Sequence, residues 1–87
     1  MEKQIRIKRL YFRSAHRGSK EIDLILGPYA AENLETMSDD ELDEFEAFLS
    51  ENDTDIWDWV TGKAEPEEAW RYKNLLARLR KIYDVTG

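Results

Sequence analysis

The chain has 87 residues, 41% of them hydrophobic, which indicates one domain near the small end of what folds unaided. It contains no Cys, and this excludes both a disulfide framework and a metal site built on thiolates. The formal net charge of −6 argues against a general nucleic-acid binder, because such proteins need positive charge to contact phosphates. We therefore expect a single domain, residues 1–87, with no nucleic acid among its partners.

Helical spacing of apolar residues predicts a first helix over residues 4–15. Gly18 then interrupts the pattern, and a Gly at this place favours the left-handed conformation that closes a helix. The apolar stripe restarts at Ile22. We expect Gly27-Pro28 to end this second helix and Pro28 to begin a short third one, because proline fits the first position of a helix.

The clearest helix start is SDDE at 38–41, a capping box. In this motif the side chains of Ser38 and Glu41 each accept a hydrogen bond from the other residue's backbone N–H group. Met37 and Leu42 occupy the positions of a hydrophobic staple, which fixes the direction in which the chain enters a helix.

Asn52-Asp53 is expected to end this acidic helix, and either Asp53 or Asp55 to cap the next one, which Gly62 closes. Pro66 is expected to open the last and longest helix. The apolar stripe of that helix is Ala69, Tyr72, Leu76, Leu79 and Tyr83.

No stretch alternates convincingly between apolar and polar residues, as a half-buried strand would. The sequence therefore predicts an all-α fold, a compact bundle of five to six short helices. Its core is expected to include Leu10, Ile22, Leu42, Phe45, Leu49, Val60, Leu76 and Leu79.

Trp57 and Trp59 stand two residues apart, so on a helix their side chains point in directions about 160–200° apart. One of them belongs to the core. The other is either a half-exposed contact anchor or is packed on a neighbouring helix as well, and the sequence leaves both choices open.

Charge is divided sharply along the chain. Residues 1–20 hold seven Lys or Arg and one acidic residue, whereas residues 21–62 hold fourteen acidic residues and no Lys or Arg. The two blocks either attract each other within one monomer or form two faces of opposite sign that orient a protein partner.

Few residues are suited to catalysis or metal binding. The acidic run at 38–46 lacks the alternate ligands and central Gly of a calcium loop. His16 is the only His, which excludes zinc sites with several His ligands. Ser14, His16 and Asp23 could be imagined as a triad, but no nucleophile elbow accompanies them. We expect a protein that is not an enzyme and holds no metal.

No apolar run approaches the roughly 20 residues of a membrane span. The beginning of the chain, MEKQIRIKRL, has neither an apolar stretch nor a cleavage site of the kind found in signal peptides. The expected location is the bacterial cytoplasm, without membrane insertion.

The stretch Arg17-Gly18-Ser19-Lys20-Glu21 resembles the RGxxE motif of the SdhE family, also called succinate dehydrogenase assembly factor 2. The later stretch SDDELDEFEAFLSENDTDIWDWV is similar to the second block of that family, a capped acidic helix followed by D-x-D and a Trp. The resemblance covers roughly residues 6–62, with the closing helix in outline.

This resemblance implies an all-helical assembly factor that binds the flavoprotein subunit of succinate dehydrogenase and, in bacteria, of fumarate reductase. It would promote covalent attachment of FAD to its client, holding no FAD stably by itself, and we expect it to be a monomer. The residues that the resemblance places at the client interface are Arg17, Gly18 and Glu21, with His16, Asp23 and Trp59 as further candidates.

Two other classes of function stay open at this point. One is an antitoxin-like or other protein-interaction module. The other is a small helical DNA-binding domain that would use the basic first helix, residues 4–15.

Overall fold

The computed structural model describes residues 2–68 and 70–86, and within them the chain is all-α, which confirms the predicted fold class. The elements in chain order are α1 (Glu2–Ala15), α2 (Lys20–Asn33), the short 3-10 helix η1 (Leu34–Thr36), α3 (Asp39–Leu49), α4 (Asp53–Thr61) and α5 (Lys73–Thr86). Their number agrees with the expected bundle of five to six short helices.

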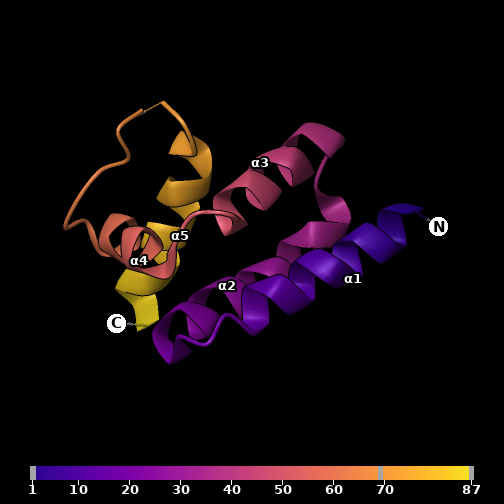
Figure 1. The fold of residues 1–87 in the computed structure, drawn as a ribbon, viewed down its shortest axis with the longest axis horizontal. Coiled ribbons are helices and arrows are strands. Elements are labelled where there is room, and N and C mark those ends of the chain that lie inside the picture. The colour runs from indigo at the N-terminus through magenta and orange to yellow at the C-terminus, as the bar shows by residue number, and fades with distance from the viewer. Residues whose placement is uncertain (1, 69, 87) are drawn as a thin grey trace.

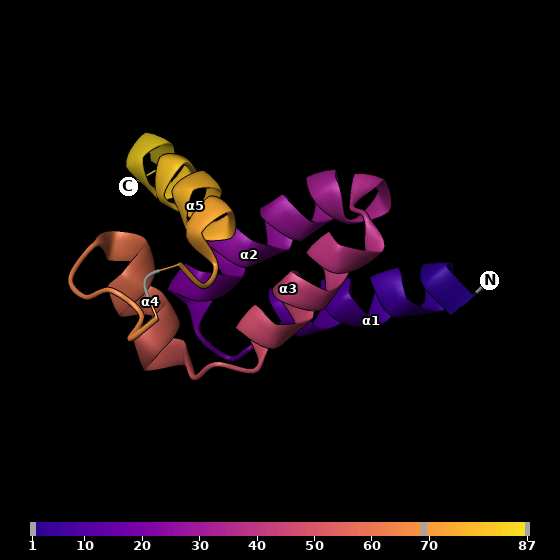
Figure 2. The ribbon, with the colours of Figure 1, turned by 90° about the horizontal axis from the view of Figure 1, so that it is seen from above.

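The helices meet around one core. α1 and α2 lie side by side and run antiparallel, and α3 lies over this pair (Figures 1 and 2). α4 and α5 pack together near the connection between α1 and α2 (Figure 1). Segments far apart in the sequence are thereby brought to one end of the molecule.

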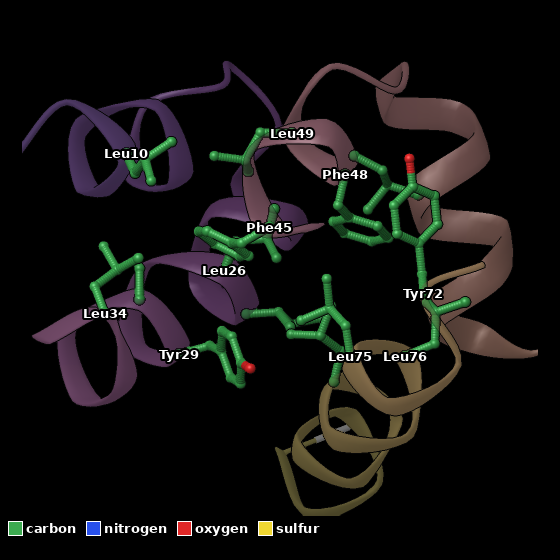
Figure 3. Close-up of a cluster of buried hydrophobic side chains, with 14 of the residues drawn as sticks. Leu10, Leu26, Tyr29, Leu34, Phe45, Phe48, Leu49, Tyr72, Leu75 and Leu76 are labelled. Carbon is green, nitrogen blue, oxygen red and sulfur yellow. The ribbon is translucent and has the colours of Figure 1, made fainter. Parts of the chain in front are cut away.

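All of the predicted core residues, from Leu10 to Leu79, are buried. Figure 3 shows Phe45 and Phe48 of α3 pointing into the space between α2 and α5. The ring of Phe45 lies 5.7 Å from that of Tyr29, and the ring of Phe48 lies 5.1 Å from that of Tyr72. The core therefore joins the α1–α2 pair to the α4–α5 pair, both through direct contacts of α2 and through these two rings of α3.

The expected break at Gly27-Pro28 is wrong, because α2 continues through both residues. Pro28 has no N–H group to donate and so costs the helix one backbone hydrogen bond. The buried face of α2 nevertheless continues on either side of it, and a Cβ on Gly27 would lie only 3.4 Å from the Cβ of Ala15. Close packing against α1 thus favours one continuous helix over two short ones.

The capping box at the start of α3 is confirmed. Ser38 N donates to Glu41 Oε1 at 3.0 Å, and Glu41 N donates to Ser38 Oγ at 3.2 Å. The expected cap of α4 is wrong, since Asp53 is already the first helical residue and Asn52 caps the helix by accepting from Asp55 N at 2.9 Å. Gly62 closes α4 with φ of 83°, as expected.

The last helix starts later than expected, at Lys73 rather than Pro66, and α1 and α2 equal its 14 residues. Tyr72, directly before it, has φ of 61°, a left-handed conformation that no α-helix can contain. Its ring is buried against Phe48, which accounts for the conformation. Ala69, the first residue of the predicted stripe, lies outside the described residues.

Opposite charges of the two blocks pair within the chain. Arg6 of α1 contacts Asp43 at 2.6 Å and Glu46 at 2.8 Å, both on α3. Arg13 lies 3.9 Å from Glu46. Two of the basic side chains of α1, those of Arg6 and Arg13, therefore pair with acidic side chains of α3.

Candidate functional site

The RGxxE stretch forms the corner between α1 and α2. Residues 16–19 make the connection, and Gly18 within it has φ of 97°. A Cβ on Gly18 would meet no atom within 4 Å. Glycine is therefore required by the backbone conformation and not by lack of space, and the corner is open to solvent.

Arg17 is not the exposed residue that the sequence led us to expect, because only 12% of its side chain is accessible. Its Nε donates to Asp53 Oδ1 at 2.6 Å. Its two terminal nitrogens donate to the backbone oxygens of Leu49 at 2.7 Å and Glu51 at 2.8 Å. The last carbonyl groups of a helix lack partners within it, and the guanidinium supplies donors to this part of the chain.

Arg17 thereby links two connections that are distant in sequence. Figure 2 shows the α1–α2 connection beside the α3–α4 connection, and the three side-chain hydrogen bonds of Arg17 join them. The backbone N of Arg17 also donates to Asp23 Oδ1 at 2.9 Å. Asp23 therefore holds the corner from the first turn of α2.

Glu21 is exposed on the first turn of α2. Its carboxylate accepts a hydrogen bond from the hydroxyl of Ser19 at 3.4 Å, which is at the long end for a hydrogen bond. The local pairing between Arg17 and Glu21 that the sequence allows is not formed, since Arg17 turns toward Asp53. The Glu21 carboxylate therefore faces solvent beside the open backbone of Gly18.

His16 is also exposed, and its ring stacks on Phe12 with 4.2 Å between the centroids and 17° between the planes. Phe12 is itself 62% exposed. A shallow hollow of about 270 Å³ lies here, lined by Phe12, Arg13, His16, Arg17 and Asp53. The corner thus presents an aromatic surface next to its charged groups.

Trp59 does not join this corner. It is buried, with 9% of its surface exposed, and its ring centroid lies 6.2 Å from those of both Phe48 and Tyr72. Trp59 is therefore the core residue of the pair, a choice that the sequence left open, and its place among the further interface candidates is not supported by exposure. Trp57 is the half-buried member of the pair and packs edge-on against Tyr83 at 5.6 Å.

The residues of the imagined triad have separate partners. Ser14 Oγ donates to Leu10 O at 2.6 Å, Asp23 accepts from the Arg17 backbone, and His16 Nδ1 lies 3.0 Å from Phe12 O. In the part of the chain that the structure describes, no group of three or more acidic or His side chains is placed to hold a metal ion. Among residues 2–68 and 70–86, none of the helices has the length and apolar character of a membrane span.

Sequence reasoning missed Asp53 as a partner of Arg17. A signal for it was present, because Asp53 opens the D-x-D of the second block that resembles the family pattern. The backbone acceptors at Leu49 and Glu51 carry no such signal, since any residue offers a carbonyl group.

Comparisons with known proteins agree on one family. Residues 8–83 match the family model described as the flavinator of succinate dehydrogenase. Two curated proteins named mitochondrial succinate dehydrogenase assembly factor 2 are similar: that of Candida glabrata is 43% identical over 83% of this chain and 49% of its own, and that of Cryptococcus neoformans is 38% identical over 92% and 45%. The chain thus spans about half the length of these relatives. No solved structure matches it.

These names contradict the expected location. The sequence led us to expect the bacterial cytoplasm, but the similar curated proteins, including one from Saccharomyces cerevisiae that is 38% identical over 85% of this chain and 48% of its own length, are described as mitochondrial and come from fungi. The expectation of a bacterial cytoplasmic location relied on the lack of a signal-peptide pattern in this sequence. That lack carries no information about the location of these relatives, so the expectation was wrong.

Proposed function

This chain belongs to the family described as the flavinator of succinate dehydrogenase, and from that membership we propose that it promotes covalent attachment of FAD to the flavoprotein subunit of succinate dehydrogenase. Fumarate reductase is a second proposed client. The chain acts as an assembly factor and not as an enzyme, since the bond-forming chemistry is that of the flavin and the client. It binds one conformation of the client more tightly than others and so raises the population of that conformation.

The observation that carries this proposal is the open corner at Gly18. Its backbone is accessible from the outside, Glu21 beside it points to solvent with one weak partner, and His16 adds an exposed aromatic ring. Backbone that is open at a glycine allows close approach of another protein. A free carboxylate can accept charge-assisted hydrogen bonds across such a contact.

The client contact proposed here comprises Gly18, Glu21 and His16. Asp23 supports the corner from within α2 and is half-buried. We propose that the chain works as a monomer and that FAD stays with the client, so that no stable flavin site is needed on the chain itself.

The alternative of a DNA-binding helix has less support. Arg6 and Arg13 of α1 pair with acidic residues of α3, and Arg17 pairs with Asp53. Together with the net charge of −6, these pairs weaken the field that phosphate binding requires. No feature of the structure singles out an antitoxin-like role.

The test is covalent flavin, measured by in-gel fluorescence of a purified flavoprotein subunit supplied with FAD, with and without this chain. We expect the chain to raise the covalent signal and Glu21→Ala to lower that gain. Glu32→Ala is the matched control, because Glu32 is an exposed acidic residue at the other end of the same helix. A signal that does not depend on the chain would contradict the proposed function, and equal signals with both variants would remove Glu21 from the contact.

A further inference from the structure

We propose that Asp53 is a positioning residue for the client contact and that Arg17 serves the same purpose instead of touching the client. The expected effect on client binding rests on the proposed function. The way in which Asp53 and Arg17 hold the corner is a property of this chain alone. Asp53 lies 36 positions along the chain from Arg17, at the start of a different helix. The α3–α4 connection would thus take part in client binding without contacting the client.

The first argument is the occupancy of the guanidinium. All three nitrogens of the Arg17 side chain donate hydrogen bonds inside the chain, at 2.6, 2.7 and 2.8 Å. These distances are those of strong charge-assisted bonds. With 12% of the side chain exposed, Arg17 would have to leave three partners to reach a client, and two partly buried carbonyl acceptors would lose their donor.

The second argument is the neighbour that Arg17 controls. Gly18 follows it directly, and a glycine has more backbone freedom than any other residue. A corner that contains one keeps a single shape only if its flanks are held. Here the backbone N of Arg17 is bonded to Asp23, and its side chain is bonded to the α3–α4 connection.

The third argument is the placement of Asp53. It is the first helical residue of α4, directly after the cap Asn52, so its backbone position is fixed by the helix start. Its side chain is 37% exposed, but one carboxylate oxygen accepts a hydrogen bond from Arg17 Nε. A contact surface that is already in its bound shape loses less conformational entropy on binding, and this is how a residue behind the surface raises affinity.

The test compares two aspartates that each pair with an arginine at the same distance, one arginine in the α1–α2 connection and the other within α1. Asp53 lies 2.6 Å from Arg17, and Asp43 lies 2.6 Å from Arg6. Each arginine keeps other acceptors after its aspartate is removed. We expect Asp53→Ala to raise the dissociation constant for the isolated flavoprotein subunit roughly tenfold, the factor that corresponds to one charge-assisted hydrogen bond, and Asp43→Ala to leave it unchanged.

Two further variants separate positioning from a general effect on α4. Asp53→Asn keeps an acceptor for Arg17 Nε and is expected to restore most of the affinity. Asp55→Ala removes another acidic residue from the first turn of α4 and is expected to bind normally. All four variants are compared at a temperature well below their melting transitions.

Whether Asp53 holds the corner can also be measured without the client, and so independently of the proposed function. Hydrogen exchange of the Arg17 backbone amide, which donates to Asp23, should become faster in Asp53→Ala and stay slow in Asp43→Ala. Unchanged exchange, or unchanged affinity in Asp53→Ala alongside a loss in Arg17→Ala, would overturn the proposal and make Arg17 a direct contact. If the unaltered chain neither binds the flavoprotein nor raises its covalent flavin, the proposed function fails, and the exchange result still decides whether Asp53 positions the corner.

Discussion

Gly18 and Gly62 are both glycines with a positive φ, but they lie in two different settings. Both have positive φ, 97° and 83°, and a Cβ would have free space at either position. At Gly62 the backbone hydrogen bonds are those of a helix end, from Gly62 N to Trp59 O and from Ala64 N to Asp58 O. Arg80 of α5 also donates to Trp59 O and to Glu65, each at 2.8 Å. At Gly18 the preceding residue, Arg17, is bonded to four other residues, which are Asp23, Leu49, Glu51 and Asp53.

The difference teaches that a left-handed glycine is not in itself a functional signal. The end of α4 fully accounts for Gly62. Closing α1 would equally account for Gly18, but it does not require the contacts that Arg17 makes or an exposed Glu21 with one weak partner. An arginine is bonded to the chain at both corners, so what marks the first corner is the exposed Glu21 beside the open backbone of Gly18. The predictions below test whether the two corners differ in function while sharing one fold.

The largest expected effect is on the core that both corners share. Phe45→Ala should lower the free energy of unfolding by about 3–5 kcal/mol, because Phe45 is fully buried and its removal leaves a cavity. That is a large part of the stability of a domain this small, so both corners should be lost together. Thermal or denaturant unfolding checks this.

Leu24→Ala is the control for this prediction. Leu24 is 64% exposed on α2, and its truncation should change the free energy of unfolding by less than about 0.5 kcal/mol. If the two variants unfold alike, Phe45 does not hold the two halves of the bundle together.

A second prediction concerns Tyr72, which lies on the Gly62 side of the molecule. Burial, with help from its hydrogen bond to Glu51 at 2.8 Å, raises the pKa of Tyr72 to about 12 from an ordinary value of 10.0. Between these values the unfolded chain loses the phenol proton while the folded chain keeps it. Stability from this group is therefore complete below pH 10 and falls as the pH rises toward 12, by roughly 2 kcal/mol.

Tyr72→Phe has no phenol to titrate, so its free energy of unfolding should fall less over the same pH range. Equal slopes for the variant and the unaltered chain would show that another group causes the alkaline loss. At neutral pH the variant should support covalent flavin attachment normally, because Tyr72 donates to the carboxylate of Glu51, whereas Arg17 is held by the backbone oxygen of that residue, which the variant keeps. If Tyr72→Phe lowered covalent flavin attachment while remaining folded, the Gly18 and Gly62 regions would not be functionally distinct.

Local patterns made much of this fold predictable. The positions of Gly18 and Gly62 after apolar helical stripes, and the Ser38–Glu41 capping box, depend on residues close in sequence. The late start of α5 was not predictable in this way. It follows from the left-handed Tyr72, whose ring packs on Phe48 of a different helix.

The candidate site shows the same limit. The sequence indicates which residues stand at the corner but not which way they turn. Arg17 turns inward because it donates to the backbone carbonyl oxygens of Leu49 and Glu51. No pattern of side chains in the sequence reveals acceptors of this kind. Likewise the spacing of Trp57 and Trp59 shows that they face opposite ways, but only the packing of Phe48 and Tyr72 decides that Trp59 is the buried one.

The most direct test of the account places the same side chain at both glycines. Gly18→Arg and Gly62→Arg should each lower the free energy of unfolding by about 1–2 kcal/mol, because both positions require a left-handed backbone. With the two variants shown to be folded, covalent flavin in the flavoprotein subunit is then measured for each. The account predicts that Gly18→Arg abolishes the gain that the chain provides, whereas Gly62→Arg retains it. Equal flavin levels with the two variants would contradict the assignment of the Gly18 corner as the client contact.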